Sequence, residues 1–243
     1  MRSDTQRTSP RSGPALVALA VDLDRTLLPP DVGTVRSAPS ILRAVQRMGV
    51  RVVLVSGREH SVLSEFSRRL RYIDALVAEN GAVVEAPLGD RVRRVGRATG
   101  LRVRQRLSGR PWARAEYGDV VASVPRVLRS RVVPIVKDLG VELVPNVDRV
   151  MILPKGVSKA SGMQLALAGL HLPGGRYAAI GDGENDLPLL RAATISAAVH
   201  NAHPRVRARV DYVCRASYDA GVAEFVRGPL TRALRGRDVV PRH

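Results

Sequence analysis

The 243-residue chain is poor in several residue types that would each indicate a particular class of protein. Cys214 is the only cysteine, so an internal disulfide is excluded. No run of about 18 apolar residues occurs, which argues against a hydrophobic membrane span. Residues 1–14 carry no apolar signal core, and we expect them to form a disordered tail. Together these absences predict a soluble, cytoplasmic protein with no membrane association.

Aromatic residues are also scarce, at 3% of the chain, so the core must consist mainly of valine, leucine, alanine and isoleucine. The charge, in contrast, is strongly basic: 39 lysines and arginines oppose 22 acidic residues, for a net charge of +17. Basic proteins often bind nucleic acids, anionic surfaces or acidic small molecules. The shortage of aromatic side chains argues against stacking on bases, so nucleic acid is the weaker explanation.

Alternating apolar and amphipathic segments predict an α/β fold. Between residues 15 and 80, three apolar runs predict buried strands and the two segments that separate them predict helices: 15–21, 37–48, 50–56, 58–70 and 74–80. This order requires right-handed crossovers and a parallel sheet. The same rhythm returns after residue 154. We therefore predict a Rossmann-like, doubly wound parallel-sheet core formed by residues 15–82 and 155–235, followed by a frayed tail at 236–243.

Residues 83–154 have a different texture and predict an inserted α+β cap domain. A hairpin is expected around residues 87–89, followed by a helix near 125–140. Two further strands are expected at 141–146 and 148–154. This antiparallel pattern interrupts the parallel one, which is typical of an insertion.

Polar residues follow three of the predicted core strands. Asp22 and Asp24 end the first strand, Ser56 ends the second, and Asp182 and Asp186 follow a later one. In open parallel sheets, ligands bind beyond the carboxyl ends of the strands, so these side chains should converge. Several carboxylates in one place suit a hard cation such as Mg²⁺, usually with a phosphate. Each piece alone is explained equally well by an ordinary turn, and only their joint order indicates a site.

The choice of lysine at residue 159 adds to this pattern. Among the 39 basic residues only Lys137, Lys155 and Lys159 are lysines. Such a uniform preference for arginine indicates a general compositional bias. A lysine near the start of a predicted helix therefore suggests that a compact ammonium group is required there. Lys155 is better explained as a surface residue.

Four segments together resemble the motifs of a known superfamily. In order and spacing, "DLDRTL" (22–27), "VSGR" (55–58), Lys159 and "GDGENDLPLL" (181–190) resemble the four motifs of the haloacid dehalogenase phosphohydrolases. The subgroup with a cap after the third core strand fits best, and it includes Cof-like sugar phosphatases, sucrose-phosphate phosphatases and archaeal-type phosphoglycolate phosphatases. "ENGAVV" (79–84) resembles its passage into the cap.

The resemblance implies a Mg²⁺-dependent phosphatase that acts through an aspartyl phosphate on a small phosphorylated metabolite, such as a sugar phosphate or phosphoglycolate. It makes Asp22 the nucleophile and Asp24 the acid and base. Asp22, the backbone carbonyl of Asp24, Asp182 and Asp186 would hold Mg²⁺. The residues expected to bind substrate or phosphoryl oxygens, or to support that binding, are Ser56, Gly57, Lys159, Asn185, Thr26 and Arg58.

Two features depart from the family pattern or lie outside it. Arg25 stands where the family commonly has glycine, which permits a positive-φ turn, and we expect its side chain to point to solvent, with contact to an anionic substrate as the alternative. Residues 91–114 carry nine arginines and no acid. We rank a solvated basic face first, a guide for a polyanionic substrate second and a nucleic-acid patch third.

Two other functions remain possible from the sequence. A phosphosugar mutase on the same scaffold would also form an aspartyl phosphate. A non-catalytic basic binding protein is the other alternative, which the intact Asp22, Asp24, Lys159 and Asp182 argue against. The sequence is compatible with a monomer or a homodimer.

Overall fold

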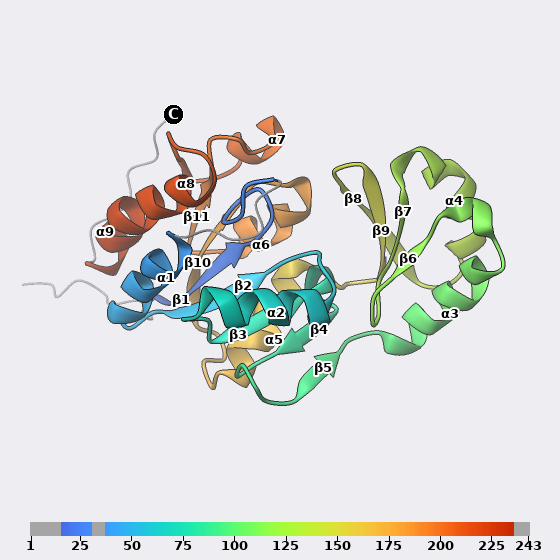
Figure 1. Ribbon diagram of the computed structural model, residues 1–243, viewed down its shortest axis with the longest axis horizontal. Helices are drawn as coiled ribbons and strands as arrows, with labels where there is room; N and C mark the ends of the chain where they lie inside the picture. The colour runs from blue at the N-terminus through green and yellow to red at the C-terminus, as the bar shows by residue number, and fades with distance from the viewer. Residues whose placement is uncertain (1–15, 31–36, 236–243) are drawn as a thin grey trace, which may run out of the picture.

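Two β-sheets organise the part of the chain that the computed structural model describes, residues 16–30 and 37–235. The predicted tails, 1–14 and 236–243, lie outside the described residues. Figure 1 shows the larger sheet with its helices in one half of the molecule and the smaller sheet with α3 and α4 in the other. Among the described residues, no helix has the length and apolar character needed to cross a bilayer.

The large sheet has eight strands in the order β12-β11-β10-β1-β2-β3-β4-β5. Along the chain these are β1 (Leu16–Asp22), β2 (Arg51–Val55), β3 (Ala75–Ala78), β4 (Val83–Glu85), β5 (Val92–Arg94), β10 (Arg176–Gly181), β11 (Ile195–Ala198) and β12 (Tyr212–Val213). The six strands from β12 to β3 pair in parallel. The predicted α/β fold with a parallel-sheet core is therefore confirmed.

Helices cover both faces of this sheet (Figure 1). They are α1 (Ala38–Arg47), α2 (His60–Leu70), α5 (Lys159–Gly169), α6 (Leu187–Ala192), α7 (Pro204–Arg207), α8 (Tyr218–Phe225) and α9 (Thr231–Leu234). Two short 3₁₀ turns, η1 (Glu79–Gly81) and η4 (Glu184–Asp186), and a π-helical turn, η5 (Val226–Leu230), accompany them. The sequence of α1 shows why it packs as it does. Its buried residues are Ala38, Ile41, Leu42 and Val45, spaced so that they form one apolar stripe of a helix.

The small sheet is antiparallel, in the order β6-β7-β9-β8. It consists of β6 (Glu116–Tyr117), β7 (Ala122–Pro125), β8 (Val141–Asn146) and β9 (Arg149–Pro154), together with α3 (Arg97–Ser108), α4 (Arg129–Val136) and the turns η2 (Pro111–Ala113) and η3 (Arg126–Leu128). This part has a hydrophobic cluster of its own, which includes Val103, Leu107, Val124, Val132 and Ile152.

The boundary of the insertion differs from the predicted one. The hairpin around residues 87–89 forms, but β4 pairs with β3 and β5 pairs with β4, so both strands extend the large sheet. The reason is that Val83 and Val84 are buried against the core, which continues the sheet beyond β3. The segment that builds the small sheet therefore begins at α3, and not at residue 83. The division into separate domains stays a prediction.

Two helices of the small part also differ from expectation. The helix expected near 125–140 is shorter, with α4 covering Arg129–Val136 and Pro134 inside it. Helix α3 was not predicted, because Val103 and Leu107 are the buried residues on a helix that is otherwise mostly charged or polar. Two buried positions are too few to produce a recognisable helical pattern.

The start of α5 is fixed by a cap and by a close backbone contact. Ser158 caps the helix: its Oγ accepts from the Ser161 backbone N–H at 3.2 Å, and the Ser161 Oγ accepts from the Ser158 backbone N–H at 2.9 Å. Gly81 has φ +100°, and a Cβ there would lie 2.0 Å from the Ser158 carbonyl oxygen. Because Lys159 follows Ser158, this contact determines where Lys159 enters the core.

The Gly81 contact yields a stability prediction with a matched control. Gly89 also has positive φ, at +89°, but a Cβ there would meet nothing within 4 Å. We expect Gly89→Ala to lower the free energy of unfolding by about 1–2 kcal/mol through backbone strain alone. Gly81→Ala should lower it by about 3 kcal/mol or more, because a backbone clash is added. Urea unfolding measures both, and equal losses would contradict a tight contact at Ser158.

Candidate active site

The carboxyl ends of β1, β2 and β10 meet at one edge of the large sheet, because β1 pairs in parallel with both of the other strands. A cleft of about 890 Å³ lies there and is lined by residues of both sheets. The predicted site residues at its surface are Asp22, Asp24, Gly57, Arg58, Lys159, Asp182 and Asn185. Thr26, Ser56 and Asp186 are fully buried behind this surface.

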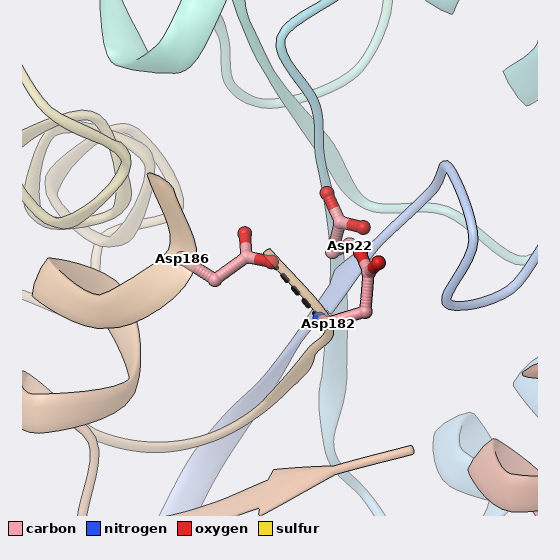
Figure 2. Close-up of side chains that lie close together, drawn as sticks. All are labelled: Asp22, Asp182 and Asp186. Carbon is pink, nitrogen blue, oxygen red and sulfur yellow. Dashed lines mark hydrogen bonds between the residues drawn. The ribbon is translucent and has the colours of Figure 1, made fainter. Parts of the chain in front are cut away.

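Three carboxylates from three segments converge in this cleft (Figure 2). Asp22 ends β1, Asp182 follows β10 and Asp186 ends η4, and each offers an oxygen within 4.8 Å of the other two. All three are at most 8% exposed. Oxygen donors of this kind fit a hard divalent cation, whose charge would offset the repulsion between the carboxylates. The donor set is therefore suitable for the metal that the resemblance implies.

Asp186 also shapes the loop that carries Asp182. Its Oδ2 accepts from the backbone N–H groups of Asp182 at 3.0 Å and Gly183 at 2.9 Å, and the first of these bonds is drawn in Figure 2. The carboxylate thus closes the turn after β10 from within. As a result, the direction of Asp182 depends on Asp186.

Lys159 is the cation that the acidic cluster already contains. Its Nζ donates to the Asp22 Oδ1 at 2.6 Å and to the Asp186 Oδ1 at 2.5 Å, and its side chain is 1% exposed. Burial by itself would lower the pKa of the ammonium, but the charges of Asp186 and Asp22 more than offset burial and raise it above the ordinary value. The two carboxylates therefore favour the charged form of Lys159.

The carboxyl groups of the cluster are shifted in the opposite sense. Burial, together with the charge of Asp186, raises the pKa of Asp22 well above its usual range, although Lys159 opposes the shift. Burial and Asp186 also raise the pKa of Asp182 to about 6, against the opposing charges of Lys159 and Arg25. One ammonium is not enough to balance three carboxylates in this dry environment.

Asp24 lies apart from the cluster and is held by Arg58. The Arg58 Nε donates to the Asp24 Oδ1 at 2.9 Å and the Arg58 Nη2 to the same oxygen at 2.6 Å, while the Ser56 Oγ donates to the Asp24 Oδ2 at 3.3 Å. The Arg58 guanidinium also stacks over the Phe66 ring, 4.8 Å from its centre. Asp24 is 41% exposed, so one aspartate of the pair is buried and the other faces the cleft.

Arg25 has the backbone of the glycine it replaces but not the predicted side-chain direction. Its φ is +61°, in the left-handed region that glycine favours. The side chain does not point simply to solvent: its Nε donates to the Asp182 Oδ2 at 3.2 Å, with 47% of the side chain exposed. The excess negative charge of the cluster explains this orientation. The Arg25 carbonyl in turn accepts from the Asn201 Nδ2 at 2.7 Å.

Two other predicted residues make contacts that the sequence did not suggest. The Thr26 Oγ1 donates to the Asp182 Oδ1 at 3.3 Å, so this hydroxyl supports an acid of the cluster and does not reach the cleft surface. The Asn185 Nδ2 donates to the Asn80 Oδ1 at 3.1 Å.

The nine arginines of residues 91–114 lie outside the cleft. Within the described residues, the arginines that line it are Arg25, Arg58, Arg126 and Arg149. On α3, Arg106 pairs with Asp138 at 2.8 Å and Arg104 stacks over the Tyr117 ring. This placement fits the solvated basic face better than a guide into the cleft. Arg126 and Arg149 were not predicted as cleft residues, because the direction of their side chains depends on how the small sheet packs against the large one.

Glu79 is a buried acid that the sequence analysis also missed. Its carboxylate is 1% exposed and accepts from the backbone N–H groups of Asp119 at 2.7 Å, Val120 at 2.9 Å and Val121 at 2.7 Å. Those three residues belong to the loop between β6 and β7, so Glu79 attaches the small sheet to the large one. A charged residue directly after the apolar run of β3 was the available signal.

Comparison with known proteins assigns this fold and site to a family. The haloacid dehalogenase-like hydrolase family matches residues 19–93 and 146–226, which include every motif residue described above. The chain belongs to the haloacid dehalogenase-like hydrolases, as the resemblance predicted. Within that family its relatives indicate the kind of enzyme, and the chain is a phosphatase.

Two relatives support the assignment of the chain as a phosphatase. A phosphoglycolate phosphatase of Methanothermobacter thermautotrophicus is 30% identical over 218 residues, which cover 86% of this chain and 97% of the relative. A phosphoglycolate phosphatase of Methanothrix thermoacetophila is 30% identical over 222 residues, covering 86% and 95%. The chain therefore spans nearly the whole length of both.

Solved structures share the fold at lower identity. A protein of Thermoplasma acidophilum superposes with a TM-score of 0.74 at 19% identity, over 87% of this chain and 97% of the other. The sugar phosphatase BT4131, of haloacid dehalogenase subclass IIB, gives 0.71 at 19% identity, over 87% and 98%. These likenesses extend across both sheets.

The raised pKa of Asp182 predicts how stability changes with pH in chelator-treated protein. Between its ordinary value of 3.8 and about 6, the folded protein binds more protons at Asp182 than the unfolded chain. Folding stability contributed by this group is therefore lost as pH rises through that interval. We expect Asp182→Asn to gain stability relative to the wild type as pH rises from about 4 to 6, as measured by urea unfolding. A difference independent of pH would contradict the raised pKa.

Proposed function

We propose that the protein is a Mg²⁺-dependent phosphomonoesterase that hydrolyses a small phosphorylated metabolite through an aspartyl phosphate on Asp22. The observation that carries this proposal is the buried contact of Lys159 with Asp22 and Asp186, beside Asp182 at the floor of the cleft. A structural role alone does not account for three buried carboxylates within one cluster. A phosphoryl group and a cation would balance them.

The proposed metal ligands are carboxylate oxygens of Asp22, Asp182 and Asp186, with the backbone carbonyl of Asp24. Asp186 would join the set through an oxygen that also accepts a hydrogen bond, and Thr26 and Arg25 hold Asp182 in direction. When bound, Mg²⁺ would neutralise charge on the phosphoryl oxygens. Metal binding favours ionised carboxylates, which is the reverse of what burial does to Asp22 and Asp182.

In the first step, a carboxylate oxygen of Asp22 attacks phosphorus, and the bond from phosphorus to the leaving oxygen breaks. Asp24, at the cleft surface, gives its proton to that oxygen. In the second step, Asp24 takes a proton from water, the water oxygen attacks phosphorus, and Asp22 and phosphate are released. Arg58 and Ser56 hold the Asp24 carboxyl group at the cleft surface. Lys159 would donate to a phosphoryl oxygen in both steps.

The substrate we propose is a small phosphorylated acid or sugar, with phosphoglycolate as the first compound to test. Two relatives named above are phosphoglycolate phosphatases, which supports this choice. The cleft supports it too, because two arginines of the inserted part, Arg126 and Arg149, line it. Arg149 is held by the Ser123 Oγ at 2.8 Å and by Glu116 at 3.1 Å, and its guanidinium is thereby fixed in place.

Replacing the proposed nucleophile tests the mechanism. We expect Asp22→Asn to reduce phosphate release from phosphoglycolate, sugar phosphates and 4-nitrophenyl phosphate by about a thousandfold or more, because the amide cannot form the phosphoenzyme. Circular dichroism checks the fold, and Asp90→Asn, on an exposed loop, should keep wild-type turnover. Retained turnover in Asp22→Asn would rule out this nucleophile. If the wild type released isomer and no phosphate, a mutase would replace the phosphatase.

The Arg25 contact predicts an effect on metal affinity that needs no substrate. After chelation, calorimetric titration with Mg²⁺ should show binding about threefold to fivefold tighter in Arg25→Gly than in the wild type. Removing the guanidinium frees Asp182, but the pair is partly exposed, so the gain is modest. Arg114→Gly, at another positive-φ arginine that does not line the cleft, is the matched control. Unchanged or weaker binding in Arg25→Gly would contradict the competition.

A further inference from the structure

The amide side chain of Asn201 bonds to the turn that follows Asp24, and the proposed reaction does not use it. Its Nδ2 donates to the carbonyl of Arg25 at 2.7 Å, and its Oδ1 accepts from the backbone N–H of Tyr218 at 3.1 Å. A carbonyl requires a donor and an N–H requires an acceptor, so only one orientation of the amide satisfies both partners. Asn201 lies on the loop after β11, where it lines the cleft.

The bond to the Arg25 carbonyl acts on a strained part of the chain. Arg25 has φ +61°, a left-handed conformation that is unfavourable for most residues other than glycine. The peptide before Arg25 is held by the bond from its own N–H to the Leu28 carbonyl at 2.8 Å. The peptide after Arg25 is held by Asn201. Since each peptide unit is planar, these two bonds fix the backbone on both sides of Arg25.

The same turn carries three groups of the proposed metal site. The Asp24 carbonyl, a proposed ligand, belongs to the peptide that precedes Arg25. The Arg25 guanidinium and the Thr26 hydroxyl both donate to the Asp182 carboxylate. The loop after β11 also reaches this acid, because the His203 backbone N–H donates to the Asp182 carbonyl at 2.9 Å. That loop therefore connects the turn after β1 to the turn after β10.

We propose that Asn201 is a positioning residue for the metal site, a proposal that rests on the function proposed above. Its bond holds Arg25 in the left-handed conformation, and the Asp24 carbonyl thereby keeps the direction in which it can bind Mg²⁺. Glycine at residue 25 would reach this conformation without help, whereas arginine depends on the bond. The arginine at residue 25 thus makes the contact from Asn201 necessary.

A capping role for α8 does not explain the whole contact. Ser217 precedes α8 without a side-chain cap bond, and the Asn201 Oδ1 accepts from the Tyr218 N–H in its place. That role uses only the oxygen of the amide. The amide nitrogen bonds to the turn after β1, 176 positions away in sequence, and a helix cap does not require that bond.

Two backgrounds that both lack the Arg25 guanidinium test the proposal. Arg25→Ala keeps the backbone strain, because alanine also disfavours positive φ, and Arg25→Gly removes it. Full-length, chelator-treated protein is titrated with Mg²⁺ by calorimetry. Relative to each parent, we expect Asn201→Ala to weaken binding about tenfold on Arg25→Ala but about twofold or less on Arg25→Gly, as for one hydrogen bond that matters only under strain. His200→Ala, at an exposed neighbour that does not line the cleft, should bind like its parent.

A second readout needs no metal. In urea unfolding of the chelator-treated protein, Asn201→Ala should lose more stability on Arg25→Ala than on Arg25→Gly, and circular dichroism checks that each variant folds. Equal losses of Mg²⁺ affinity in the two backgrounds would overturn the proposal, and equal losses of stability as well would leave Asn201 as a cap of α8 alone. A wild-type protein that neither binds Mg²⁺ nor releases phosphate would instead contradict the proposed function, and this proposal with it.

Discussion

The ammonium of Lys159 lies between the carboxylates of Asp22 and Asp186, and the remainder of the site depends on this buried contact. Without that cation, two desolvated carboxylates would face one another at the end of β1 with no ammonium to offset their repulsion. The ammonium reaches them because Ser158 and Gly81 fix the start of α5 against the turn after β3. Residues 137 positions apart in sequence thus meet at 2.6 Å. The three carboxylates still carry more negative charge than Lys159 offsets. The side chain of Arg25 turns toward Asp182 for this reason.

The topology of the large sheet explains how site residues that are distant in sequence meet at one place. Parallel pairing brings the ends of β1, β2 and β10 to one edge, and the inserted small sheet leaves from β5 and returns at α5. The family matches residues 19–93 and 146–226, which leaves out residues 94–145. The unmatched stretch contains α3, β6, β7 and α4. The motif residues therefore lie in the matched part of the chain, and most of the small sheet lies outside it.

The sequence was most informative where function depends on strand ends and least informative where it depends on docking. Asp22 and Asp182 could be placed because each follows an apolar run, and Lys159 because the chain otherwise prefers arginine. The direction of Arg25 could not be predicted, since it is set by Asp182, far away in sequence. The contact between Asn80 and Asn185 could not be predicted either, because the two residues lie 105 positions apart in sequence. The position of β4 and β5 depended on which sheet they joined, and local pattern does not report that choice.

Glu79 joins the two sheets through a carboxylate and three backbone amides, and not through an apolar surface alone. Residues 119–121 are therefore bonded directly to the part of the chain that forms the large sheet, although they belong to the insertion by sequence. A foreign insertion grafted between β5 and α5 would have to present three amides at the same place, or it would leave a desolvated acid unpaired. The buried carboxylate of Glu79 thus limits which inserted segments the core can accept during evolution. This limit applies regardless of the substrate that an inserted segment would recognise.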